Sequence, residues 1–340
     1  MTFFSPEQEA VLNAIQSPLP FVRLPFLVLE KEIGIPEGDI IRITQGLKDA
    51  GVIRSIAGIF NGSALGYKLS LVAFSVGQRD IERSAAKINA HPGVSHNYLR
   101  DHKFNLWFTI AETSDEDLQR SVNALAKDSG AVEHLLLKNE RMIKIGFRLN
   151  FGNRGKAAPV DKRRADNVPL TDVEKETVLL LQKDMPVAPR PFKELAEGSN
   201  LSEDELIENA AALEEKGVLR RYAGVLRHQK AGYNSNAMTA WKLNAAADGE
   251  ETEAAIKYFA EEPAVTHLYL RTVYPGRWEY PLFAMIHGRS DEELNGIING
   301  LEEKSGLRDK LVLRSLKEFK KQRVIYFSPE FNKWKEQNYD

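Results

Sequence analysis

The sequence predicts an α+β fold in which a helix-rich segment followed by a strand-rich segment occurs twice. The main observation is an internal repeat, because Leu47–Tyr67 matches Leu213–Tyr233, which lies 166 residues further along the chain. A second observation is that apolar residues in each copy change from helical spacing to the alternation typical of strands. Between the copies, residues 151–168 are rich in Gly, Pro and charged residues, so we interpret them as a linker.

Two further matches extend the repeat into the strand-rich segments. His91–Arg100 matches Glu262–Arg271, and Phe104–Ile110 matches Tyr280–Ile286 after the offset has grown to 176 residues. The growth of the offset places a longer loop in the second copy. We therefore expect the two copies to share one architecture.

The helix-rich segments, 1–62 and 169–230, each predict a winged helix-turn-helix domain. In the second copy, Ser202 and Glu205 form a capping-box pattern at a helix start, and Gly217 supplies a helix stop. A short hairpin is expected after this helix in each copy.

The strand-rich segments, 63–150 and 231–327, each predict the order βαββαβ of a ferredoxin-like domain. In the first copy the strand-like runs are LSLVAFSV, VSHNYLR, NLWFTIA and HLLLKNERMIKIGF, with two helical runs among them. Residues 328–340 follow the second copy as a tail.

Composition limits the chemistry that the chain can use. Of its 340 residues, 43% are hydrophobic and 28% charged, as in ordinary soluble globular proteins. Cysteine is absent, which excludes disulfides, thiolate metal ligands and a cysteine nucleophile. The sequence shows neither a signal-peptide pattern nor an apolar run of membrane length, so we expect a cytoplasmic protein.

Two matching sets of polar side chains form the candidate site. Residues two apart on a strand face the same side, so each set places an imidazole, a phenol and a guanidinium on one face. Such a face can supply acid–base chemistry and bind anions. A single histidine of this kind is more often a structural residue, but all three residue types recur in both copies. The sets are His96, Tyr98, Arg100 and His267, Tyr269, Arg271.

Aromatic and basic residues surround both sets in the sequence. Flat aromatic surfaces beside cations suit a large planar polyanion. The alternative for Trp107 and Trp278 is ordinary core packing, and the alternative for His287 is a turn cap. These residues are His102, Phe104 and Trp107 in the first copy and Arg277, Trp278, Tyr280 and His287 in the second.

The predicted wing of the second copy carries several cations. The matching stretch of the first copy has only Arg54, so the two copies are not functionally equivalent. A solvated hairpin would also explain such charges. The cations are Arg220, Arg221, Arg227, His228 and Lys230.

Charge argues against specific DNA binding. The region Ser202–Gly217 would be the recognition helix of the second copy, yet it carries six acidic residues and one basic residue, Lys216. A DNA-binding surface needs cations for the phosphate backbone. We therefore expect these helices to be a retained scaffold.

A helix-turn-helix followed by a βαββαβ domain resembles the feast/famine, or AsnC-type, transcription regulators, whose α+β domains dimerise. Here one chain would supply both members as an internal pseudo-dimer. A more specific resemblance comes from HPGVSHNYLRDHKFNLWFT, VTHLYLRTVYPGRWEYPLFAMIHGRS and RRYAGVLRHQKAGY, which look like signatures of the two siroheme decarboxylase subunits. That family's activity would be the conversion of siroheme to didecarboxysiroheme, in the pathway to haem or to haem d1.

The resemblance suggests roles for the candidate residues. His96 and His267 would deliver protons, with Tyr98 and Tyr269 as orienting or relay groups. We expect no cofactor of the protein's own, since iron arrives with the substrate, and His102, His228 or His287 could bind that iron axially. The substrate-binding residues would be Arg100, Arg271, His102, Phe104, Trp107, Arg221, Arg227, His228, Lys230, Trp278 and His287.

Two other functions stay open at this point. One is a DNA-binding regulator that senses a tetrapyrrole, and the other is a non-catalytic carrier of haem-like molecules. In all three cases the expected partner is siroheme or a related iron tetrapyrrole, without a membrane. Assembly into a larger homo-oligomer is a further expectation that the sequence leaves undecided.

Overall fold

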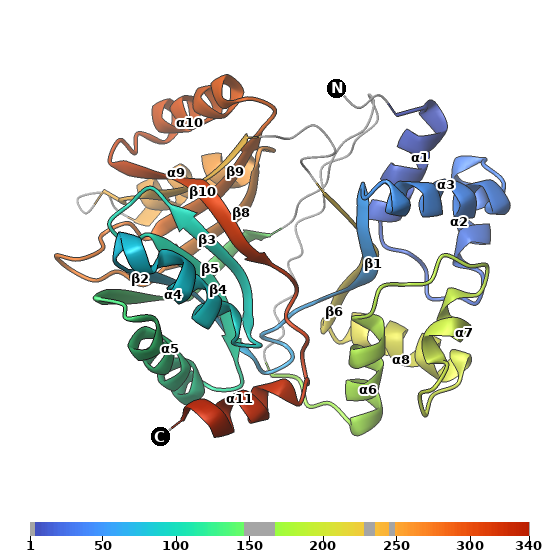
Figure 1. Cartoon of the computed structure of the whole chain (residues 1–340). Coiled ribbons are helices and arrows are strands. Elements are labelled where there is room, and N and C mark those ends of the chain that lie inside the picture. Colours follow the sequence, from blue (N-terminus) through green and yellow to red (C-terminus); the bar gives the residue numbers. More distant parts are fainter. Residues whose placement is uncertain (1–3, 146–166, 228–234, 245–248, 340) are drawn as a thin grey trace. The chain divides into compact units, whose positions relative to one another are not determined.

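The computed structural model describes residues 4–145, 167–227, 235–244 and 249–339, in two compact units (Figure 1). The helical unit contains the described residues up to 66 together with 167–227, and so holds both helix-rich segments. The barrel unit contains 67–145, 235–244 and 249–339, and holds both strand-rich segments. Equivalent parts of the two copies thus fold together, which confirms the predicted internal pseudo-dimer.

Three helices of each copy form the helical unit. They are α1 (Pro6–Gln16), α2 (Pro25–Ile33) and α3 (Glu37–Asp49), then α6 (Asp172–Leu181), α7 (Pro191–Ala196) and α8 (Glu203–Glu215). Local sequence sets their starts, because Ser5 and Thr171 form capping boxes on α1 and α6. The predicted capping box of Ser202 and Glu205 begins α8, and Gly217 follows its end with a φ of 70°.

The strand after each helix-turn-helix pairs with its counterpart in the other copy. β1 (Ile53–Phe60) and β6 (Leu219–Leu226) form an antiparallel two-stranded sheet in which Ala57 lies opposite Ala223. Our prediction of a hairpin within each copy is therefore wrong for the described residues. The physical reason is shared burial, because helices of both copies cover each strand: α1 and α8 pack on β6, and α3 and α6 pack on β1.

Each half of the barrel unit has the predicted order βαββαβ. The first half has β2 (Lys68–Ser75), the short turn η1 (Gln78–Asp80), α4 (Ile81–Asn89), β3 (Val94–Arg100), β4 (Leu106–Glu112), α5 (Asp115–Ser129) and β5 (Glu133–Ile145). The second half has β7 (Ser235–Trp241), α9 (Gly249–Glu261), β8 (Val265–Arg271), β9 (Leu282–Gly288), α10 (Asp291–Ser305) and β10 (Lys310–Lys321).

The strands of the two halves close into one barrel with the order β10-β3-β4-β2-β5-β8-β9-β7. The last strand of each half reaches into the other, because β5 pairs with β2 and then β8, while β10 pairs with β7 and then β3. Closure leaves no unpaired strand edge in the barrel. The long strands β5 and β10 therefore join the pseudo-dimer.

Three apolar clusters stabilise the barrel unit. One lies under α4 and α5 and includes Val72 and Phe74, and another lies under α9 and α10 and includes Trp241. The third, which we call the interior cluster, includes Leu71 and Ala73 on the opposite face of β2. Alternation along each strand thus separates a face under the helices from a face inside the barrel.

A last helix, α11 (Glu330–Asn338), lies within the segment predicted as a tail. It packs against α5 and buries Phe331 and Trp334.

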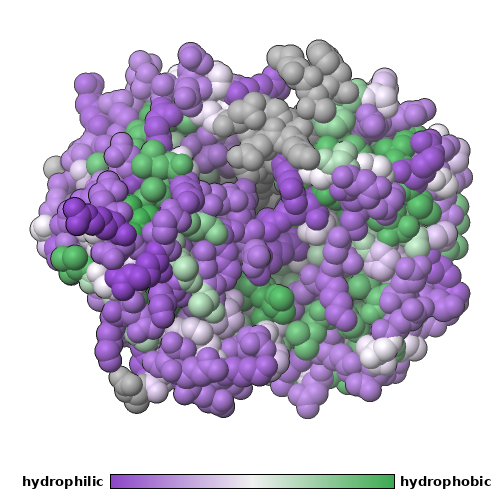
Figure 2. Space-filling view, viewed as in Figure 1, coloured by the Kyte–Doolittle hydropathy of each residue, from purple (hydrophilic) through white to green (hydrophobic). Residues whose placement is uncertain are grey.

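The face of the molecule in Figure 2 is covered mainly by hydrophilic residues, with smaller apolar areas among them. None of the described helices is both long and apolar enough to cross a membrane.

Candidate functional site

Strand β3 presents its three predicted side chains to the interior of the barrel. Tyr98 lies opposite Trp107, a member of the interior cluster, whereas the neighbouring Asn97 bonds to α4 on the other face. His96 and Arg100 lie two residues on either side of Tyr98, so they share its face. The first set therefore has the geometry that the sequence predicts.

Strand β8 repeats this arrangement. Tyr269 lies opposite Phe283 of the interior cluster, whereas Leu268 belongs to the cluster under α9 and α10. His267 and Arg271 lie on the face of Tyr269. The imidazole and phenol rings are 6.2 Å apart in the first set and 6.3 Å apart in the second.

The arginine of each set donates hydrogen bonds to a strand of the other half. Arg100 Nη1 donates to the carbonyl oxygen of Leu313 at 2.6 Å and to the Ser315 hydroxyl at 3.2 Å, both on β10. Arg271 Nη1 donates to the carbonyl oxygen of Leu137 on β5 at 3.0 Å. Leu313 and Leu137 are equivalent in the repeat, so the contact obeys the pseudo-symmetry.

Neither guanidinium group has a balancing carboxylate, although Arg100 is buried and Arg271 is half-buried. Arg100 is 5% exposed, and burial lowers the pKa of Arg100 and of Arg271 to about 10. The Nε atom of each is buried and has no hydrogen-bond partner, and neither forms an ion pair within the described residues. A nearby tyrosine ring, 5.3 Å from Arg100 and 4.7 Å from Arg271, provides only partial compensation. Two uncompensated cations whose buried Nε donors are unused are suited to an anionic ligand.

A hydroxyl group contacts each histidine of the two sets. The Ser95 hydroxyl lies 3.0 Å from His96 Nδ1, and the Thr266 hydroxyl lies 3.0 Å from His267 Nδ1. Burial and repulsion from Arg271 lower the pKa of His267 from 6.5 to about 4. His267 is therefore neutral at pH 7 in the chain alone.

The strands beside the two sets differ in polarity. On β10 the residues opposite His96 and Tyr98 are charged, whereas on β5 the residues opposite His267 and Tyr269 are apolar. The two sets are thus related by the fold but not identical in environment. The four neighbours are Lys321 and Glu318 on β10 and Ile145 and Met142 on β5.

The predicted aromatic surface lies within the interior cluster. Trp107 and Trp278 are 1% and 2% exposed, and their ring centroids are 5.3 Å apart. Each indole N–H donates to a backbone carbonyl, that of Phe104 at 2.6 Å and that of Tyr280 at 2.9 Å. This geometry is that of core packing, the alternative that the sequence left open. Contact of Phe104, Trp107 and Trp278 with a substrate stays a prediction.

Two further histidines lie in the barrel unit near these aromatic residues. His102 stacks on Phe104 with an interplanar angle of 20°, and its Nδ1 accepts the Phe104 N–H at 3.0 Å. Burial lowers the pKa of His102. His287 is buried on β9, on the face that also carries Phe283 and Met285.

The basic residues of the second copy's wing belong to the helical unit. Arg221 lies on β6, and Arg227 follows that strand with its N–H bonded to the Val52 carbonyl at 2.9 Å. His228 and Lys230 lie outside the described residues. The roles assigned to these four residues stay predictions.

Sequence reasoning missed the groups that hold the site residues in place. The hydroxyls of Ser95 and Thr266 were detectable, because each directly precedes a site histidine at the same position of the repeat. The carbonyl groups that bind Arg100 and Arg271 were not, because any residue supplies a carbonyl and the pairing of β3 with β10 spans more than 200 residues.

Comparison with known proteins agrees with this architecture. A family model described as the AsnC-like ligand binding domain matches residues 64–144 and 230–320. A second model, the siroheme decarboxylase NirDL-like HTH domain, matches residues 8–54 and 174–220. A siroheme decarboxylase of Hydrogenobacter thermophilus is 39% identical over 329 residues, which cover 96% of this chain and 97% of that protein. The chain belongs to the siroheme decarboxylase family.

Other relatives show the same fused arrangement. A siroheme decarboxylase NirDL subunit of Paracoccus denitrificans is 34% identical over 284 residues, which cover 83% of this chain and 85% of that protein. The crystal structure of the siroheme decarboxylase NirDL in complex with an iron-uroporphyrin III analogue matches with a TM-score of 0.74 and 35% identity, and covers 97% of this chain and 98% of that chain. Family and fold thus agree with the resemblance found in the sequence.

Proposed function

We propose that this chain is a siroheme decarboxylase that removes two acetate carboxyl groups from siroheme to give didecarboxysiroheme, on the route to haem or haem d1. The observation that carries the proposal is the pair of arginines Arg100 and Arg271, whose Nε atoms are buried without a partner and whose charges no described carboxylate balances. Siroheme has four acetates and four propionates, and a guanidinium binds a carboxylate through two parallel hydrogen bonds. Membership of the siroheme decarboxylase family supports the same substrate.

The histidines supply the protons. In each decarboxylation the bond from a methylene carbon to a carboxylate breaks, carbon dioxide leaves, and the electron pair passes to the methylene carbon conjugated with the macrocycle. A proton on that carbon then completes a methyl group. A carboxylate close to His267 raises its pKa from about 4, because an opposite charge favours the protonated ring. Substrate binding therefore charges this proton donor. In the other set the proton donor is His96.

Iron enters with the substrate. His102, His228 or His287 would bind that iron, and His102 would do so through Nε2 because its Nδ1 accepts the Phe104 N–H. The wing cations Arg221, Arg227 and Lys230 hold further carboxylates that the reaction retains. Among the described residues no three His, Asp or Glu side chains gather as ligands for a metal ion.

The helix-turn-helix domains motivate one other candidate function, a DNA-binding regulator that senses a tetrapyrrole. In α8 the acidic residues Glu203 and Asp204 form ion pairs with Arg190 and Arg23, so the nearby cations are already engaged. We therefore expect no sequence-specific DNA complex. A gel shift that favours one sequence and strengthens at low salt would contradict this expectation.

Anaerobic incubation of the pure chain with siroheme, followed by mass spectrometry of the tetrapyrrole, tests the proposal. A decarboxylase gives a product that has lost two molecules of carbon dioxide. A carrier or a regulator returns siroheme of unchanged mass, and that result would refute the proposed activity.

A further inference from the structure

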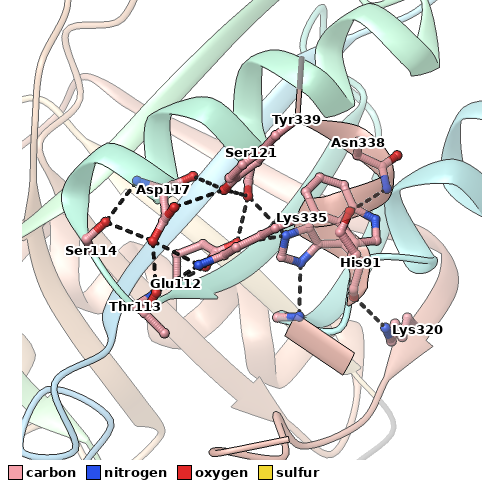
Figure 3. Close-up of polar contacts among 12 residues, drawn as sticks. His91, Glu112, Thr113, Ser114, Asp117, Ser121, Lys320, Lys335, Asn338 and Tyr339 are labelled. Carbon is pink, nitrogen blue, oxygen red and sulfur yellow. Dashed lines mark hydrogen bonds and ion pairs between the residues drawn. The ribbon is translucent and has the colours of Figure 1, made fainter. Parts of the chain in front are cut away.

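Helix α11 fills a site on the first half of the barrel unit that we call the α11 site, formed by His91, Asp117 and Ser121 (Figure 3). The Trp334 ring packs edge-on against the His91 ring at 4.1 Å. Lys335 Nζ lies 2.8 Å from an Asp117 carboxylate oxygen. An aromatic anchor and a lysine on one helix are thus the groups that this site recognises.

The interior of the α11 site is polar and fully satisfied. His91 Nδ1 accepts the Gly93 N–H at 2.9 Å, so its Nε2 carries the hydrogen and lies 3.1 Å from the Glu112 carboxylate. Glu112 also lies 3.1 Å from Lys335 Nζ. Burial lowers the pKa of His91, which keeps the ring neutral. The site is therefore a built recognition surface and is occupied by the chain's own helix.

The second half has a groove at the equivalent place, between α9 and α10. This α9–α10 groove has a volume of about 530 Å³ and is lined by Tyr258, Glu262, Glu293, Gly296, Ile297 and Gly300, among others. In the repeat, Glu262 takes the place of His91, Glu293 that of Asp117 and Ile297 that of Ser121. The groove thus keeps the carboxylate that binds a lysine in the first half.

The α9–α10 groove is also more open than its counterpart. Gly296 and Gly300 replace Arg120 and Ala124, and nothing lies within 4 Å of the position that a Cβ would take at either glycine. Glycine inside a helix destabilises the helix relative to alanine. Tyr258 on the rim is 45% exposed, so an aromatic surface accompanies the open space.

We propose that the α9–α10 groove binds an amphipathic helix of a partner protein, through an aromatic residue over the two glycines and a lysine bonded to Glu293. The rim is acidic, since Glu261, Glu262 and Glu293 stand against Lys304, and this charge suits a basic helix. The chain's own linker lacks these anchors. At the repeat positions of Phe331, Trp334 and Lys335 it has Gly155, Ala158 and Pro159, all outside the described residues.

A labelled peptide of residues 326–340, which carries the anchors of α11, tests the proposal by fluorescence anisotropy with the full chain. We expect saturable binding to one site. Glu293→Lys and Gly300→Leu should each raise Kd at least tenfold, whereas Glu303→Lys, on the same helix but outside the groove, should not. Circular dichroism would establish that all three variants are folded.

Three results would overturn the proposal. One is no saturable binding up to millimolar peptide, and another is binding that Glu293→Lys leaves unchanged. The third is binding that appears only after residues 146–166 are replaced by a Gly-Ser segment of equal length, which would assign the groove to the chain's own linker.

Discussion

Arg100 on β3 donates a hydrogen bond of 2.6 Å to the carbonyl oxygen of Leu313 on β10, so the last strand of the second half fixes a guanidinium of the first. Arg271 and Leu137 repeat the contact in the other direction. Each set of candidate residues is therefore completed by the other half of the chain. This reciprocity explains why one fused chain can supply what two subunits would supply.

If the buried arginines serve the substrate rather than the fold, their loss should weaken binding without weakening the protein. Replacing a buried, unpaired charge by an apolar side chain of similar length is often neutral or stabilising. We therefore expect Arg100→Met and Arg271→Met to change the free energy of unfolding by no more than about 1 kcal/mol. Each should raise the Kd for siroheme at least tenfold, measured by absorbance titration.

Arg83→Met is the matched control for the arginine variants. Arg83 lies in the same unit but already pairs with Asp80 at 2.8 Å, so its loss should leave siroheme affinity unchanged. A large loss of stability with unchanged affinity in Arg100→Met would show that the guanidinium is structural.

Removal of a proton donor should slow turnover while binding persists. We expect His96→Ala or His267→Ala to lower the decarboxylation rate by roughly a hundredfold or more, because a positioned acid contributes about that much. Single-turnover assays under anaerobic conditions would measure the effect. His134→Ala, on β5 and outside both sets, should retain the normal rate. Normal turnover in both site variants would exclude these residues as the acids.

The depressed pKa of His267 predicts a protein that loses stability in acid. The folded-state value of about 4 lies below the ordinary 6.5, so the unfolded chain binds the proton more readily between these values. The contribution of His267 is thus fully present above pH 6.5 and is lost as the pH falls toward 4, by up to about 3 kcal/mol. His267→Gln should flatten the pH dependence of chemical denaturation in this range. If this variant kept the pH dependence of the wild-type chain, the His267 ring would be hydrated in the folded chain and its pKa would not be lowered.

Much of this architecture was predictable, because periodicity and the repeat are local signals. All four strand-like runs of the first half are strands, and the capping box at Ser202 begins α8 as expected. The pairing of β1 with β6 was not predictable from one copy, since the partner strand and part of the helices that cover the pair belong to the other copy. Helix α11 was missed because its short apolar face, Phe331 and Trp334, is stabilised by contacts with distant residues.

The candidate site was also predictable in part from the sequence. Alternation on β3 and β8 placed the two polar sets correctly on one face each. It could not decide that Trp107 and Trp278 fill the barrel interior, because an aromatic residue on a strand suits a core and a ligand surface equally well.

Division of the chain should test the reciprocal pairing of the halves. Residues 1–155 and 165–340, expressed separately, each leave the barrel with unpaired strand edges, since β3 needs β10 and β8 needs β5. We expect the fragments to associate when mixed and to recover decarboxylation, measured by product mass. Full activity in either fragment alone would place the whole site within one half.

The ratio of carbon dioxide released to siroheme consumed tests the central claim most directly. The wild-type chain, incubated anaerobically with siroheme, should release two molecules of carbon dioxide for each molecule of siroheme. The double variant His96→Ala/His267→Ala should bind siroheme but release almost none in the same time. Tight binding of siroheme by the wild-type chain without release of carbon dioxide would contradict the account and leave the chain a binding protein.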